Sequence, residues 1–154
     1  MKDSNNILPH ELWVPDYLEK VPFVTVGDFR LLASTSDRYT YSDNYSSMGE
    51  YSILQKVQSN EFIELRANCN TNKSYTIKCD IYTNVNIVFY AIAKNTSTNT
   101  IVKTLNIPTG NNLLPSIIIN SNEFVGDENR LFFRIMPIQN NGVVYIDNLI
   151  LLEQ

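Results

Sequence analysis

Charged residues and histidine are scarce in this sequence, and both shortages exclude classes of function. Charged residues make up 18% of the 154 residues and hydrophobic residues 44%, so the chain is apolar enough to fold around a core. Lysine and arginine are scattered singly and the net charge is -4, which leaves no basic stripe to neutralise a row of phosphates. We therefore expect one globular domain that does not bind nucleic acid.

Long apolar runs are absent as well. No stretch has the length of a signal peptide or a membrane span, so we expect no membrane insertion and no signal peptide in this chain. Three settings remain open: the inside of the cell, a piece of a larger exported protein, or a component of a particle.

Catalytic groups in a recognisable arrangement are also missing. His10 is the only histidine and lies in a proline-flanked leader, which gives a histidine base or a Ser-His-Asp relay little to work with. The 16 acidic residues are spread out with no pair placed together, and no Gly-rich phosphate loop occurs. We expect that the protein is not an enzyme.

The two cysteines, Cys69 and Cys79, fall on the apolar sides of two alternating segments. We interpret them as reduced thiols of the core. A cross-strand disulfide would need a turn centred near Ser74, whereas a turn at Asn70 to Lys73 does not place the two cysteines opposite one another. Two isolated cysteines and one distant histidine have no recognisable metal-binding spacing.

Short runs rich in Ile, Val, Tyr, Phe and Thr recur from residue 51 onward, which is typical of an all-β fold. A turn at 70–73 predicts a hairpin of the runs 61–69 and 75–82. A second hairpin is expected from the runs 85–93 and 100–107. The nearly apolar fourth run suits a central strand covered on both faces, and a turn at 139–142 joins the last two runs. Little helix is expected, with a weak signal at 11–20 that Pro15 interrupts. The expected strands are 51–57, 61–69, 75–82, 85–93, 100–107, 117–119, 131–136 and 143–152.

We divide the chain into residues 1–20, an N-terminal tail and docking segment, and residues 21–154, a β-sandwich binding domain. Within the first part, residues 1–8 read as a tail and residues 9–20 as a segment laid against the domain or a partner. His10, Trp13 and Tyr17 suit docking to another protein subunit.

Tyrosines crowd the loop-like stretch 37–51, where polar side chains accompany them. Planar side chains with polar edges stack on sugar rings and anchor interfaces. In the alternative interpretation, Tyr51 belongs to the core and the other tyrosines pack along the edge of the sandwich. The candidate ligand-binding residues are Arg38, Tyr39, Tyr41, Asp43, Asn44 and Tyr45.

Three patches resemble one family. Gly49-Glu50-Tyr51-Ser52-Ile53 is similar to a strand entry, residues 144–151 (VYIDNLIL) to the closing strand, and residues 26–30 (VGDFR) to the opening motif of galactose-binding-like jelly rolls. Non-catalytic carbohydrate-binding modules are the nearest match. The resemblance spans residues 24 to 152 and implies an all-β, antiparallel, two-sheet jelly-roll β-sandwich.

The resemblance also implies a structural Ca²⁺ between the first and last strands. Asp147 would be a ligand, with Asp28 and the Gly49 carbonyl as further candidates, and oxygen ligands suit Ca²⁺. Arg30 departs from the family, where a glutamate is expected, and its guanidinium could instead pair with Asp147 without any metal. In a third interpretation, Asp147 and Asn148 satisfy backbone groups at a buried strand crossing.

The position of Asp147 is special even without the family. Strict alternation places it on the same face as the apolar layer of its strand, so its carboxylate requires a cation or a hydrogen-bond donor. That layer would be Val143, Tyr145, Leu149 and Leu151.

These observations favour a non-catalytic binding module for a carbohydrate or a glycosylated cell surface, with a shallow site and weak binding per site. The alternative is a structural or attachment subunit, such as a phage tail, virion accessory or adhesin domain, which would contact other protein subunits through residues 1–20. Both imply an extracellular or virion-associated place within a larger protein or particle. Oligomeric state separates the two.

Overall fold

The computed structural model describes residues 7, 23–26, 29–33, 39–42, 44, 52–57, 61–97, 99–113 and 115–154, and for 23–26, 29–33, 39–42 and 52–57 it describes the backbone. Every pairing of the described strands is antiparallel. The strands are β1 (Phe23–Val26), β2 (Phe29–Ala33), β3 (Tyr39–Ser42), β4 (Ser52–Val57), β5 (Ile63–Asn68), β6 (Tyr75–Thr83), β7 (Ile87–Lys94), β8 (Asn99–Ile107), β9 (Gly110–Asn112), β10 (Ser116–Ile119), β11 (Arg130–Pro137) and β12 (Gly142–Glu153), and a 3₁₀ turn, η1, covers Ser121–Glu123.

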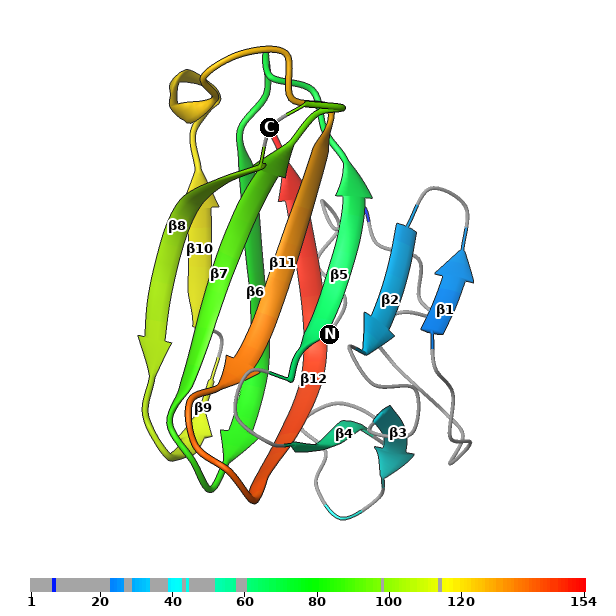
Figure 1. Cartoon of the computed structure of the whole chain (residues 1–154), viewed down its shortest axis with the longest axis vertical. Helices are drawn as coiled ribbons and strands as arrows, with labels where there is room; N and C mark the ends of the chain where they lie inside the picture. Colours follow the sequence, from blue (N-terminus) through cyan, green and yellow to red (C-terminus); the bar gives the residue numbers. More distant parts are fainter. Residues whose placement is uncertain are drawn as a thin grey trace.

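Two sheets form the sandwich. Sheet A has the order β10-β6-β12-β4-β3, with β9 also pairing with β6, and sheet B has the order β1-β2-β5-β11-β7-β8. Figure 1 shows β8, β7, β11 and β5 as one layer in front of β10, β6 and β12. The expected all-β, two-sheet jelly-roll sandwich is confirmed. None of the described residues belongs to a helix long and apolar enough to cross a membrane.

The hairpin expected around residues 70–73 is wrong. β5 pairs with β2 and β11 in sheet B, whereas β6 pairs with β10, β9 and β12 in sheet A. The turn therefore carries the chain from one sheet to the other, and residues 139–141 likewise lead from β11 in sheet B to β12 in sheet A. Alternation alone does not separate these cases, because a strand of either sheet turns its apolar side toward the shared core.

The hairpin of β7 and β8 is confirmed, with Ile87 opposite Ile107 and Lys94 opposite Asn99. β7 lies between β11 and β8, so its interior place in the sheet is also confirmed. The prediction that both faces of β7 are covered is wrong, because the side chains of Val88 and Tyr90, which point outward, are only half-buried. The outer face of sheet B is therefore partly open to solvent.

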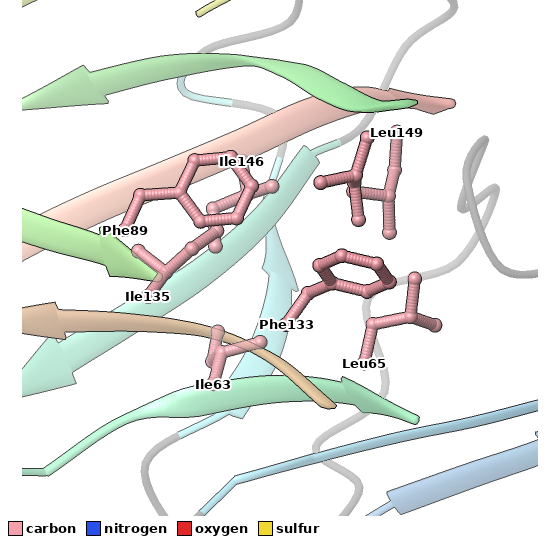
Figure 2. Close-up of a pocket in the computed structure, with 8 residues that line it drawn as sticks. Ile63, Leu65, Phe89, Phe133, Ile135, Ile146 and Leu149 are labelled. Carbon is pink, nitrogen blue, oxygen red and sulfur yellow. The ribbon is translucent and has the colours of Figure 1, made fainter. Parts of the chain in front are cut away.

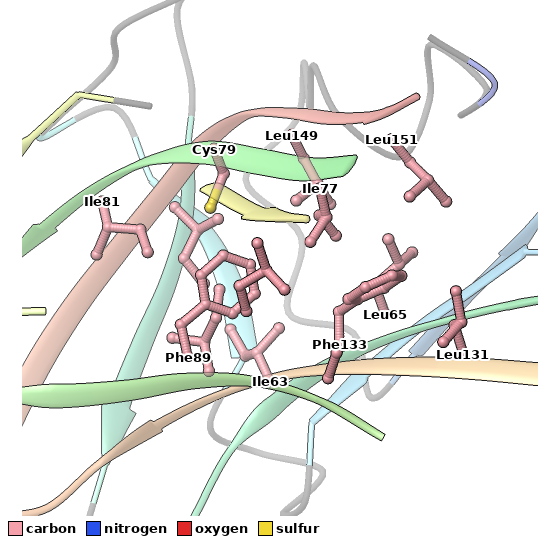
Figure 3. Close-up of a cluster of buried hydrophobic side chains, with 14 of the residues drawn as sticks. Ile63, Leu65, Ile77, Cys79, Ile81, Phe89, Leu131, Phe133, Leu149 and Leu151 are labelled. Atoms are coloured by element: carbon pink, nitrogen blue, oxygen red, sulfur yellow. The ribbon is translucent and has the colours of Figure 1, made fainter. Parts of the chain in front are cut away.

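The core fills the space between the sheets. Side chains from β5, β7 and β11 meet side chains from β6 and β12 there, as Figure 3 shows. Cys79 is fully buried as expected, Cys69 is half-buried at the edge of the core, and no disulfide joins them.

One void inside the core has no room for a ligand. Figure 2 shows eight apolar side chains from both sheets around a void of about 10 Å³. A water molecule needs roughly that volume and also polar partners. This apolar void is therefore too small to hold a ligand.

A β-bulge in β12 corrects the expected position of Asp147. Asp147 lies opposite Asp80 and Ile150 opposite Lys78, so two residues, Asn148 and Leu149, face one residue of β6. Asn148 adopts φ 50°, a left-handed conformation that asparagine tolerates better than most residues. The extra residue shifts the alternation by one position. Val144, Ile146, Leu149 and Leu151 therefore face the core, and Asp147 points to the outer face of sheet A.

Ile7 is attached to the sandwich, although it lies in the stretch expected to be a tail. Its N–H donates to the Leu151 carbonyl at 2.8 Å, and its half-buried side chain packs against the core. The rest of residues 1–20 lies outside the described residues, including the docking segment and the weak helix signal.

Candidate functional site

The six candidate ligand-binding residues are partly described. Tyr39 and Tyr41 belong to β3, the last strand of sheet A, and Asn44 follows shortly after it with an exposed side chain. The backbone register aligns Tyr39 with the row of Val144 and Tyr41 with the row of Ile146. Arg38, Asp43 and Tyr45 lie outside the described residues.

Of the three candidate calcium ligands, Asp147 is described, and Asp28 and Gly49 are not. Asp147 is 1% exposed and Asp80 beside it is 5% exposed, although both point to the outer face of sheet A. The Asn148 N–H donates to Asp147 Oδ1 at 2.8 Å, and Asn148 Nδ2 donates to Asp80 Oδ2 at 3.5 Å. The bulge thus brings two carboxylates and one amide together, and we call these three residues the bulge cluster.

The bulge cluster has the donor chemistry of a Ca²⁺ site. Asn148 Oδ1 is buried and has no hydrogen-bond partner, and buried polar atoms are nearly always paired. Carboxylate and amide oxygens are the ligands that Ca²⁺ prefers. No group of three or more His, Cys, Asp or Glu side chains that could hold a metal ion occurs among the described residues, which supply two carboxylates to this cluster.

Arg30, the competing partner of Asp147, belongs to β2 of sheet B, where the backbone register aligns it with Arg66. Asp147 belongs to β12 of sheet A. Asp80 was missed as a member of the site, because alternation placed it on the polar face of its strand together with Thr76 and Lys78.

The outer face of sheet B carries a second polar cluster, which sequence analysis did not identify. On β11, Leu131, Phe133 and Ile135 face the core, so Arg130 and Arg134 point outward. Neighbouring strands add further cations and aromatic rings to the same face. We call the following residues the cation–aromatic face: Phe62, Glu64, Arg66, Tyr90, Lys94, Arg130, Phe132 and Arg134.

Glu64 lies at the centre of the cation–aromatic face with 0% of its side chain exposed. Its two oxygens accept hydrogen bonds of 2.7 Å from Arg66 Nε and from Arg134 Nε. Burial lowers the pKa of Arg134, but the hydrogen bonds from its guanidinium to Glu64 and Tyr90 outweigh this effect and leave the pKa raised. Arg134 is therefore charged at every physiological pH.

Aromatic rings hold the cations in place. The Arg134 guanidinium carbon lies 3.9 Å from the centroid of Phe62, and its Nη1 donates to the Tyr90 hydroxyl at 3.3 Å. On the other side, Arg66 Cζ and Lys94 Nζ lie 4.5 and 5.1 Å from the centroid of Phe132. Cations over ring faces are attracted by the ring quadrupole, so these long side chains have ordered positions.

The cation–aromatic face is accessible to a ligand. The side chains of Arg66 and Arg134 are 34% and 23% exposed. A guanidinium carries five N–H donors, which bind hydroxyl or carboxylate oxygens. The signal for this site in the sequence is the order Arg130, Phe132, Arg134 at every second residue of one strand.

Sheet A carries an aromatic pair two residues before Asp147 on β12. Tyr82 and Tyr145 are opposite one another, with ring centroids 6.0 Å apart and an interplanar angle of 59°. Tyr82 is 43% exposed. The pair is a second surface on which a sugar ring could stack, without an ordered guanidinium among its described contacts.

Known proteins resemble this chain in structure rather than in sequence. No protein-family model matches the chain, and no curated protein matches it. Among solved structures, a family 61 carbohydrate-binding module in complex with β-1,4-galactotriose is 12% identical with a TM-score of 0.54, over 82% of this chain and 88% of that one. A family 16 carbohydrate-binding module is 11% identical with a TM-score of 0.55, over 75% and 85%.

Larger proteins also contain the fold. The enzymatically active domain of tailspike protein 4 from bacteriophage CBA120 is 14% identical with a TM-score of 0.57, over 82% of this chain and 19% of that one. At such low identity these likenesses show the fold alone. The chain thus has a β-sandwich similar to that of carbohydrate-binding modules, as its motifs implied.

Proposed function

We propose that the protein is a non-catalytic module that binds a glycan or a glycosylated surface through its cation–aromatic face. The observation that carries the proposal is the ordered pair of guanidinium groups, Arg66 and Arg134, which share Glu64 and rest against aromatic rings on an accessible face. The carbohydrate-binding modules among the structural neighbours support a glycan as the ligand, although a shared fold does not fix a function.

The groups on this face suit sugar hydroxyls. The guanidinium groups donate, the Tyr90 hydroxyl donates and accepts, and Glu64 keeps both arginines in position before the ligand arrives. A pre-ordered shallow face avoids part of the entropy cost of binding. We expect weak binding at one site and stronger attachment when several copies act together.

A glycan array tests this proposal. The wild-type chain and Arg134→Gln are compared with Lys78→Gln, which removes a charge from the outer face of sheet A. The proposal expects glycan binding by the wild type and Lys78→Gln, and its loss in Arg134→Gln. An array without any bound glycan, or equal binding by all three proteins, contradicts it.

The tyrosine stretch remains a second candidate for ligand contacts. The double change Tyr41→Ala and Tyr45→Ala should then weaken glycan binding and leave the melting temperature within a few degrees, because surface changes cost about 0.5 kcal/mol or less. A large fall in melting temperature would instead assign these tyrosines to the core.

A structural or attachment subunit is the second function that an observation favours. The tailspike neighbour contains this fold as 19% of its own chain. The present chain would then be an extracellular or virion-associated domain of a larger assembly, with residues 1–20 contacting other subunits. Sedimentation analysis distinguishes the two: a stable trimer, or a complex lost on deletion of residues 1–20, favours this function over a monomeric glycan-binding module.

We also propose that the bulge cluster holds a structural Ca²⁺ through Asp147, Asp80 and Asn148 Oδ1. The buried amide oxygen without a partner supports this assignment. Asp28 and the Gly49 carbonyl remain further candidate ligands. Thermal unfolding in excess calcium and then in chelator is the test: calcium should raise the melting temperature and chelator should reverse the rise, and no change in either condition contradicts the metal site.

A further inference from the structure

We infer that the cation–aromatic face takes a glycan whose sugar rings carry carboxylate groups, an inference that rests on the proposed glycan-binding function. Four cationic side chains point outward from three adjacent strands: Arg66 from β5, Lys94 from β7, and Arg130 and Arg134 from β11. The register places Arg130 beside Lys94 in one row, and Phe132 beside Arg66 in the next. The cations therefore form one contiguous surface.

Positive charge exceeds negative charge among the outward side chains of the described strands β5, β7 and β11. Of the outward side chains of β5, β7 and β11, Glu64 is the only acidic one, and it is fully buried between Arg66 and Arg134. Four cations and one carboxylate leave a formal surplus of three positive charges. The whole chain has a net charge of -4, so positive charge is concentrated here against the overall sign.

The cations that would meet the ligand are held apart at fixed positions. Arg66 and Lys94 both rest over the ring of Phe132, with Cζ at 4.5 Å and Nζ at 5.1 Å from its centroid. Arg66 uses its Nε–H on Glu64, one of the five donors of a guanidinium. An anionic group above Phe132 would therefore meet two ordered cations at once.

Carboxylated sugars fit these groups better than neutral sugars or nucleic acid. A neutral sugar leaves the surplus positive charge without a partner, whereas a carboxylate forms two parallel hydrogen bonds with a guanidinium. Single-stranded nucleic acid needs open rings on which bases stack, but the Phe132 side chain lies beneath the cations and is buried. The hydroxyl groups of a sugar can also form hydrogen bonds with the Tyr90 hydroxyl, and a simple anion has no such hydroxyl groups.

The test is calorimetric binding of an oligomer of galacturonic acid and of its fully methyl-esterified form, in which each carboxylate is replaced by an uncharged methyl ester. We expect the ester to bind at least tenfold more weakly, and added salt to weaken the binding of the acid. Arg66→Gln and Arg130→Gln should each weaken binding of the acid severalfold with unchanged circular dichroism. Lys78→Gln, a matched loss of charge on sheet A, should not.

The other outcomes separate this inference from the proposed function. Equal affinity for acid and ester overturns the inference and leaves glycan binding intact. Failure of both oligomers to bind also overturns it, and the glycan array then decides the proposed function on its own. Tighter binding of a sulfated oligosaccharide than of the acid, or of single-stranded DNA in place of either, overturns the carboxylate assignment.

Discussion

The outer faces of the two sheets both bury carboxylates, but they surround the buried charge with different groups. On sheet B, Glu64 accepts hydrogen bonds from two arginines that also pack on aromatic rings. On sheet A, Asp80 and Asp147 lie opposite one another beside an asparagine whose amide oxygen is unpaired. A buried carboxylate needs compensation in either place. The first cluster holds its carboxylate with two arginines, whereas the second combines two carboxylates with a buried amide oxygen.

Removal of Glu64 should have the largest effect on stability, because it takes away the carboxylate that Arg66 and Arg134 share on sheet B. Glu64→Leu leaves two arginines without their shared partner, and breaking a buried ion pair costs about 3 kcal/mol or more. We expect about 2 kcal/mol in urea unfolding, because both arginines are partly exposed. Glu123→Gln, which breaks a more exposed pair with Lys103, is the control and should cost less than about 1 kcal/mol. Equal losses would argue against a central role for Glu64.

Calcium binding should have the next largest effect on stability, and it tests the proposed role of the bulge cluster on sheet A. A ligand at ten times its Kd stabilises the folded state by about 1.4 kcal/mol. Asp80→Asn should remove at least half of the calcium-dependent rise in melting temperature, and Asp147→Asn should remove at least as much. Glu64→Gln, on the other sheet, should keep the full response. A full response in Asp80→Asn would exclude Asp80 from the site.

Alkaline pH should have a smaller effect, and it involves sheet A through Cys79. Burial raises the pKa of the Cys79 thiol, and the charges of Asp80 and Asp147 raise it further. Burial and then Glu128 raise the pKa of Cys69 to about 11. In the unfolded chain the thiols ionise at about pH 8.5. Stability should therefore be intact below that pH and fall as the pH rises toward 11, because the unfolded state releases protons that the folded state keeps.

Urea unfolding between pH 7 and 10.5 measures this loss. Cys79→Ala should unfold at lower urea throughout, since a buried side chain is shortened, but its stability should depend less steeply on pH above 8.5. A pH dependence identical to that of the wild type would mean that the Cys79 thiol does not contribute.

Tyr82→Ala should have the smallest effect and tests whether sheet A contributes to ligand binding. A cross-strand pair contributes about 1 kcal/mol or less, and Tyr82 is largely exposed. We expect a small change in urea unfolding and unchanged glycan binding. Loss of glycan binding in Tyr82→Ala, with binding retained in Arg134→Gln, would move the site from sheet B to sheet A.

Alternation predicted eight strands but missed β1, β2, β3 and β9, and it did not predict most of the strand partners. Every expected strand from residue 51 onward is present, because period-two patterns mark one buried face. The 70–73 turn was misassigned, since strands of opposite sheets present the same pattern. The bulge was missed for a related reason: one added residue reverses the face of everything after it, and Asn148 alone gives little sign of it.

The candidate sites depend on strand pairing even more strongly than the fold does. Asp147 could be selected from the closing motif, but Asp80 becomes its neighbour only through the register of β6 with β12. Glu64 and Arg134 are 70 residues apart in sequence. Nothing local in either strand indicates the other, so the cation–aromatic face required the structure.

The positions of β11 and β12 in the sheets limit the order in which the strands can pair during folding. These strands follow all the others in the sequence, yet β11 lies between β5 and β7, and β12 lies between β6 and β4. A growing chain can close the β7–β8 hairpin early, but neither sheet has its middle until these last strands leave the ribosome. Strands β4 to β6 must wait with open edges, and such edges are sites of mispairing. Folding of this domain should therefore be slow, as is common for folds with distant strand pairs.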